Sequence, residues 1–203
     1  MEHLHEGLRP GIVDEVRERF RKAAVSPRGL FAYPTGRAAL LALGYPEQAL
    51  SVLPESVQDC FCGVGNPFAA GLPGAGEHVL DVGCGAGVDA LVAALRVKAQ
   101  GQVTGLEFCP EMRERAQTNA ALSGIGNASF VAGEAEQLPF ADASFDLLLS
   151  NGVYNLVLRK DQALAEAFRV LRPGARLQVA DQIREESAPP LQACSLEAKG
   201  WAA

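Results

Sequence analysis

The strongest constraint on the fold of this chain is a run of short apolar segments that alternate with helical patterns. The strand-like segments lie at 78–82, 102–107, 128–133, 144–151 and 175–181. Helical patterns between them lie at 87–99, 110–124 and 160–171. Repeated strand–helix–strand units predict a parallel sheet with right-handed crossovers and helices on both faces. We therefore expect an α/β fold with a Rossmann-like, doubly wound and mostly parallel sheet, which binds ligands at the carboxyl ends of its strands.

Residues 1–76 precede this pattern and are expected to form a helical extension and lid, while residues 77–203 form the ligand-binding domain. Helical patterns in the extension lie at 12–24, 36–43 and 46–53. The first of these places Ile12, Val16 and Phe20 on one face of a helix. Residues 62–76 are rich in glycine and proline and are expected to be a loop. The lid is expected to include the Asn-Pro-Phe at 66–68.

A glycine-rich loop follows the first strand, in the stretch VLDVGCGAGVDA at 79–90. Gly83, Gly85 and Gly87 allow a ligand to approach the backbone, and the next helix presents free N–H groups. A triphosphate loop would need a lysine followed by serine or threonine, which this stretch lacks. A dinucleotide loop fits, because Glu107 lies 20 residues after Gly87. This spacing predicts a ligand with adenosine and ribose and leaves its identity open.

Asp81 separates these ligands by charge. It stands two residues before the first glycine, where the strand ends. A carboxylate there repels a pyrophosphate and attracts a cationic or amino-bearing ligand. S-adenosylmethionine has both a sulfonium and an amino group, so Asp81 favours it over a dinucleotide.

Four stretches, in order along the chain, resemble the motifs of class I S-adenosylmethionine-dependent methyltransferases. VLDVGCGAG resembles the first motif of the family and VTGLEFCPEM its acidic second-strand motif. FVAGEAEQLPFADASFDLLLSNGVYNLV resembles the third- and fourth-strand motifs, and LRPGARLQVAD the fifth. The resemblance covers about 77–181, and it implies S-adenosylmethionine as the cofactor.

The resemblance implies roles for residues of the first two motifs. Asp81 and the backbone of Gly83 and Gly85, in the loop that ends at Gly87, would hold the methionine end of the cofactor. Glu107 would accept hydrogen bonds from the two ribose hydroxyls. A tight turn and a solvated carboxylate are the structural alternatives for the loop and for Glu107.

Residues of the later motifs are assigned in the same way. Phe108 and Met112 would flank the adenine, and helix packing is the alternative for Met112. Glu134 replaces the usual aspartate that receives the adenine amino group, and Ala135 would donate its N–H to the ring. Asn151 would face the methyl-transfer region, or cap the loop after its strand.

A closer resemblance is to arsenite methyltransferases, on SNGVYNL and the segments beside it. That group binds trivalent arsenic with separated cysteine thiolates, which are soft ligands. Cys60 and Cys62 stand where the first thiolate is expected, whereas Gly152 replaces the second and Cys194 lies near the third. We therefore expect two thiolates at most, with Asn151, Cys62 and Cys60 as the catalytic candidates. We expect no resident metal.

Charge and length limit the other functions. A net charge of −6 and a pI near 5.1 argue against nucleic-acid binding. No apolar run approaches 18 residues and no signal peptide is visible, so we expect a cytoplasmic protein without a membrane partner. The 22 residues after Asp181 do not fit the last two strands of the usual seven. The exposed sheet edge that would result is a candidate homodimer surface.

Three functions remain, in this order. The first is a methyltransferase that acts on a small-molecule acceptor, with trivalent arsenic and thiols as candidates. The second is a noncatalytic protein that binds S-adenosylmethionine or a partner and has a degenerate acceptor site. The third is a nicotinamide-dependent oxidoreductase, which Asp81 disfavours.

Overall fold

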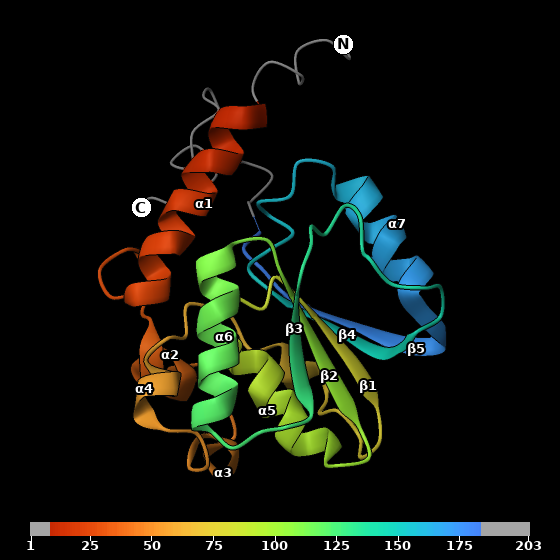
Figure 1. The fold of residues 1–203 in the computed structure, drawn as a ribbon, viewed down its shortest axis with the longest axis horizontal. Helices are drawn as coiled ribbons and strands as arrows, with labels where there is room; N and C mark the ends of the chain where they lie inside the picture. The colour runs from red at the N-terminus through yellow and green to blue at the C-terminus, as the bar shows by residue number, and fades with distance from the viewer. Residues whose placement is uncertain (1–8, 184–203) are drawn as a thin grey trace.

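The computed structural model describes residues 9–183, which form a five-stranded sheet between two layers of helices (Figure 1). The strands are β1 (His78–Val82), β2 (Gln102–Glu107), β3 (Ala128–Ala132), β4 (Phe145–Asn151) and β5 (Leu171–Ala180). Three helices connect successive strands: α5 (Val88–Val97) follows β1, α6 (Pro110–Leu122) follows β2, and α7 (Lys160–Val170) follows β4. The expected Rossmann-like α/β fold is confirmed, because every strand pair is parallel.

Alternation along the strands explains why helices cover both faces. Successive strand residues point to opposite faces, so the consecutive leucines of β4 divide between two cores. Leu147 and Leu149 pack with α5 and α6, whereas Leu148 packs with α7. All three side chains are fully buried. The apolar run in the sequence is thus that of a strand covered on both sides.

The strand order places a ligand site beside β1. The order is β3-β2-β1-β4-β5, so the chain moves outward from β1 to β3 and then returns to the other side of β1. The loops after β1 and β4 therefore leave the sheet in opposite directions. A crevice forms at such a switch point, at the carboxyl ends of the strands.

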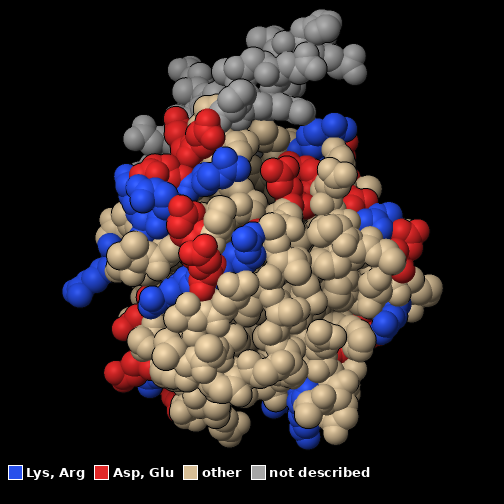
Figure 2. All heavy atoms as spheres, viewed as in Figure 1, with Lys and Arg blue, Asp and Glu red and all other residues tan. Residues whose placement is uncertain are grey.

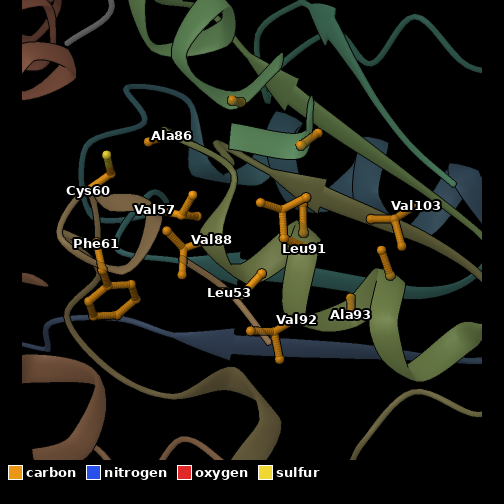
Figure 3. Packing of buried hydrophobic residues seen from close by; sticks show 14 of the residues in the cluster. Leu53, Val57, Cys60, Phe61, Ala86, Val88, Leu91, Val92, Ala93 and Val103 are labelled. Atoms are coloured by element: carbon orange, nitrogen blue, oxygen red, sulfur yellow. The ribbon is translucent and has the colours of Figure 1, made fainter. Parts of the chain in front are cut away.

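The N-terminal extension packs beside α5 and α6. It contains α1 (Arg9–Val25), α2 (Gly36–Ala42), α3 (Glu47–Leu50), α4 (Glu55–Gln58) and the 3₁₀ turn η1 (Pro67–Ala70). Figure 1 shows α1 alongside α6, and Figure 3 shows side chains from this extension packed with the helix after the glycine loop. Val16 of α1 is buried, as its predicted face requires. The division at residue 76 stays a prediction.

The last described strand lies at an edge of the sheet. Among residues 9–183, β5 pairs only with β4, and it contains Pro173, which an edge strand tolerates. The strand begins four residues earlier than predicted, and its pairing is irregular between Phe145 and Leu147. The expected loss of two further strands concerns residues outside the described part of the chain. A homodimer through this edge stays a prediction.

Charged side chains of both signs share the face of the molecule drawn in Figure 2, and the expectation about nucleic acid stays a prediction. Figure 2 shows acidic and basic side chains interspersed over α1 and α6, with no continuous basic area on the face drawn. Within residues 9–183, no helix has both the length and the apolarity to cross a bilayer.

Candidate functional site

A cavity of about 180 Å³ opens at the carboxyl ends of β1, β2 and β4. The glycine loop forms its floor, and α1 and the segment 60–63 cover it. Val16 and Phe20 line the cavity from α1, whose Arg17 lies 5.7 Å from the centre of the Phe108 ring. The extension therefore contributes directly to the site, as a lid would.

Asp81 presents an unsatisfied acceptor at this cavity. The side chain is 2% exposed, and its Oδ2 has no hydrogen-bond partner among the described residues. Burial, together with the neighbouring carboxylates of Asp89 and Glu107, raises the pKa of Asp81 well above its usual value. The Ala90 N–H, which donates to the carboxyl group, opposes this rise only in part. Such a buried group gains free energy from a donor of positive charge.

Glu107 connects the end of β2 to the glycine loop. Its Oε2 accepts from the Gly85 N–H at 2.8 Å, and its Oε1 accepts from the Cys109 N–H at 2.8 Å. Burial raises the pKa of Glu107, and these backbone bonds oppose the rise. A carboxylate has about four acceptor positions, so Glu107 keeps capacity for further donors.

Gly85 shows why a glycine is needed at the floor of the cavity. Its φ is +53°, in the left-handed region that other residues rarely adopt. A Cβ built on Gly85 meets no heavy atom within 4 Å, so a side chain there would occupy the cavity itself.

Asn151 joins the end of β4 to the segment that covers the cavity. Its Oδ1 accepts from the Val64 N–H at 2.9 Å and from the Gly65 N–H at 3.1 Å. Its Nδ2 donates to the Gly65 carbonyl at 2.8 Å and to Asp89 Oδ2 at 2.9 Å. The loop-capping and ligand-facing predictions for Asn151 are therefore compatible, because the residue also lines the cavity.

The charge of the cavity is one-sided. Five carboxylate residues line it, and none of its described lining residues is Lys, Arg or His. The five are Asp81, Asp89, Glu107, Glu134 and Glu136. A polyanionic ligand would be repelled from such a site, whereas a ligand with a cationic group would be attracted.

Cysteine residues also contribute to the lining of the cavity. Cys60, Cys62 and Cys84 all line the cavity. Burial raises the pKa of Cys62 to about 12, so its thiol is protonated at neutral pH. Arg115 Nε donates to Cys60 Sγ at 3.2 Å. Among residues 9–183, no three potential ligands of the His, Cys, Asp and Glu types are grouped to hold a metal ion.

A family model described as a methyltransferase domain matches residues 73–200. The chain belongs to this methyltransferase family. The predicted family is confirmed, and with it S-adenosylmethionine as the cofactor of the site.

Individual relatives agree with this assignment. An arsenite methyltransferase from Halobacterium salinarum is 37% identical over 147 residues, which cover 72% of this chain and 37% of that protein. A demethylmenaquinone methyltransferase from Lactiplantibacillus plantarum is 41% identical over 49% of this chain and 43% of its own length. The solved arsenic(III) S-adenosylmethionine methyltransferase of Chlamydomonas reinhardtii has a TM-score of 0.60 and 40% identity, covering 66% of this chain and 48% of that one. The chain thus spans less than half of each of these proteins.

Most of the predicted site residues line the cavity at the carboxyl ends of β1, β2 and β4. They are Cys60, Cys62, Asp81, Gly83, Gly85, Glu107, Phe108, Glu134, Ala135 and Asn151. Two predicted residues are not among the lining residues. Gly87 is the N-cap of α5, and Met112 is fully buried in the core. The role of each residue toward the cofactor stays a prediction.

Three features of the site were not predicted from the sequence. Asp89 is buried at the start of α5, and the signal was a carboxylate in the first turn of a largely apolar helix. Tyr45 reaches the site from the loop between α2 and α3. The apolar face of α1 indicated that this helix packs against another surface. The sequence pattern does not show that this surface is the cavity.

Proposed function

We propose that this chain transfers a methyl group from S-adenosylmethionine to a small acceptor with a soft nucleophilic atom, trivalent arsenic or a thiol sulfur. The observation that carries the proposal is the buried, unpartnered Oδ2 of Asp81 in a cavity lined by carboxylates. Membership of the methyltransferase family supplies the reaction class.

The residues present fit the cofactor. The amino group of its methionine end would give Asp81 Oδ2 the donor that this buried atom lacks. Gly85 leaves open space beside the loop, and Glu107 has acceptor positions left for ribose hydroxyls. Phe108, Glu134 and Ala135 line the cavity where the adenine is proposed to lie.

The chain's own task in the reaction is to align the acceptor and to exclude water. When bound, S-adenosylmethionine supplies a methyl group that its sulfonium has already activated for displacement. Val16, Phe20 and Phe61 provide apolar cover that keeps water away from the displacement. An arsenic lone pair needs no general base, so the cavity has only to hold such an acceptor in line with the methyl group.

The acceptor class is proposed from the lining of the cavity. No cationic side chain among the described lining residues would hold a carboxylate or phosphate acceptor, so a neutral acceptor is favoured. Cys60 and Cys62 offer sulfur ligands beside the cofactor loop. Two of the curated relatives are named arsenite methyltransferases, which agrees with this choice.

The alternative is a domain that binds the cofactor without turnover. It is favoured by Gly152, which stands where the related enzymes are expected to have a thiolate. It is also favoured by the absence of a three-ligand group within residues 9–183.

The test is a methyl-transfer assay with methyl-labelled S-adenosylmethionine, offered arsenite or a small alkyl thiol in the presence of reductant. The proposal expects labelled product from at least one acceptor, and the Asp81→Asn variant should bind the cofactor more weakly. Cofactor binding without any labelled product would support the alternative. An absence of cofactor binding would refute both.

A further inference from the structure

A hydrogen-bond network joins the N-terminal extension to Asn151 at the cavity through Tyr45 and Asp89, two residues that have no proposed role in methyl transfer. The Tyr45 hydroxyl donates to Asp89 Oδ1 at 2.6 Å. The other oxygen of this carboxylate, Oδ2, accepts from Asn151 Nδ2 at 2.9 Å. Asn151 Nδ2 also donates directly to the Tyr45 hydroxyl oxygen at 3.2 Å. Tyr45, Asp89 and Asn151 are therefore all bonded to one another, although Tyr45 and Asn151 are 106 residues apart in the sequence.

The network fixes which way the Asn151 amide faces. An ionised carboxylate only accepts hydrogen bonds, so Asp89 selects the NH₂ end of the amide. The Asn151 oxygen is then turned toward the N–H groups of Val64 and Gly65, from which it accepts. If the amide were reversed, an NH₂ group would face two backbone donors and the carboxylate would face an oxygen.

Packing holds both ends of the network in place. Tyr45 is 3% exposed, and its ring meets those of Phe61 and Phe68 edge-on, with centroids 5.3 and 5.9 Å apart. A Cβ on Gly63 would collide with Asn151 Nδ2, so the covering segment lies directly against the amide. The hydroxyl of Tyr45 and the amide of Asn151 thus have little freedom to move apart.

We propose that Tyr45 and Asp89 are positioning residues, which fix the Asn151 amide and through it hold the segment 62–66 over the methionine end of the cofactor site. This inference rests on the proposed function for the identity of the ligand. It extends that function by giving the N-terminal extension a part in cofactor binding.

The electrostatics give the network a pH signature. Burial raises the pKa of Asp89 to about 6, and its hydrogen bonds from Tyr45 and Asn151 oppose the rise. Tyr45 is a neutral donor, because burial raises its pKa well above the usual value. The other titratable groups around this carboxyl are Asp81 on β1, Glu107 on β2, and the thiols of Cys62 and Cys84.

Removal of the Tyr45 hydroxyl should change the pKa of Asp89, which a loss of packing alone would not do. The hydroxyl stabilises the charged form of Asp89, so its removal raises the pKa of that carboxyl. When Asp89 is protonated it no longer selects the orientation of the Asn151 amide, so cofactor affinity should decrease at low pH. This decrease, the acid limb of the affinity profile, should begin at a higher pH in the variant.

The experiment compares Tyr45→Phe and Asp89→Asn with wild type and with Tyr154→Phe as the matched control. Tyr154 is also a buried tyrosine, but it packs in the core on the α7 face and has no bond in this network. Tyr45→Phe keeps the ring and its contacts with Phe61 and Phe68. Both readouts use the full chain.

The first readout is hydrogen exchange at the Val64 and Gly65 amides without ligand. Both network variants should exchange there about fivefold to tenfold faster, which corresponds to about 1–1.4 kcal/mol. The second readout is the calorimetric affinity for S-adenosylhomocysteine between about pH 5 and pH 8. In both variants the affinity for S-adenosylhomocysteine should fall by the same factor. Tyr45→Phe should move the acid limb of this affinity to higher pH, and Asp89→Asn should remove the contribution of one carboxyl group to its pH dependence.

Exchange rates, affinities and acid limbs that match wild type in both variants would overturn the inference. Should Asp89→Asn fail to fold, Tyr45→Phe decides the question, because it removes one oxygen atom only. If wild type does not bind S-adenosylhomocysteine, the proposed function fails instead, and hydrogen exchange still tests the network.

Discussion

Glu107→Ala removes the carboxylate that joins β2 to the glycine loop. In the structure this side chain is 4% exposed and accepts from two backbone N–H groups, each at 2.8 Å. A hydrogen bond to a charged group contributes about 1.5–3 kcal/mol, and an unpaired buried donor costs about 1–3 kcal/mol. Part of this loss is offset, because burial of the charged carboxylate is itself unfavourable, as its raised pKa shows. We therefore expect the free energy of unfolding to fall by about 1–3 kcal/mol.

The same variant should lose cofactor affinity by more than its stability change suggests. Without the carboxylate, neither ribose hydroxyl has its proposed acceptor, and the Gly85 N–H no longer has its partner. The dissociation constant for S-adenosylhomocysteine should rise at least about tenfold, which corresponds to about 1.4 kcal/mol. Glu107→Gln keeps the size and one acceptor, so its affinity should lie between those of wild type and alanine.

The assay is isothermal titration calorimetry with S-adenosylhomocysteine, accompanied by urea unfolding of each variant. Glu114→Ala is the control, because Glu114 is exposed on α6 and does not line the cavity. It should leave both quantities unchanged. A folded Glu107→Ala protein that binds the ligand as wild type does would refute the role assigned to the end of β2.

Three further predictions follow from the same cavity. Burial raises the pKa of Asp81, so binding of a ligand amino group should lower that pKa and release a proton, and the affinity for the ligand should rise with pH. Calorimetry in buffers of different ionisation enthalpy should detect the released proton, and Asp81→Asn should abolish that part of the release. Gly152→Cys should raise the affinity for arsenite by adding a sulfur ligand. It should also lower the free energy of unfolding by about 1–2 kcal/mol, since the φ of Gly152 is +73° and the new Cβ would lie 3.3 Å from Val64. Thiol titration and urea unfolding test the two effects, and an unchanged arsenite affinity would contradict the first. Cys62→Ser should weaken arsenite binding whereas Cys109→Ser should not, because Cys62 lines the cavity and Cys109 does not. Equal arsenite binding by the two variants would refute this.

The sheet was predictable because its signals are local. The bounds predicted for β1 and β2 agree with the structure, and those for β3 and β4 differ by one residue at one end. The three leucines of β4 required cover on both faces, which the two cores provide. The start of β5 was harder to predict, because Pro173 and Gly174 are residue types that are rare in strands, although an edge strand tolerates them.

The site was predictable only where a motif has a fixed spacing. Asp81 and Glu107 lie at the carboxyl ends of β1 and β2, and Gly85 follows β1, so the topology alone brings them to one cavity. Met112 was placed by its motif, but the turn of α6 on which it lies faces the core. Tyr45 could not be found, since nothing in its local sequence shows that the extension folds back onto Asp89.

The most direct test of the central claim is a parallel calorimetric titration of the purified protein with S-adenosylhomocysteine and with NAD. Both ligands contain adenosine and ribose, but only NAD brings a pyrophosphate to Asp81. The account predicts saturable binding of S-adenosylhomocysteine and no measurable heat from NAD. Binding of NAD with no binding of S-adenosylhomocysteine would contradict the account.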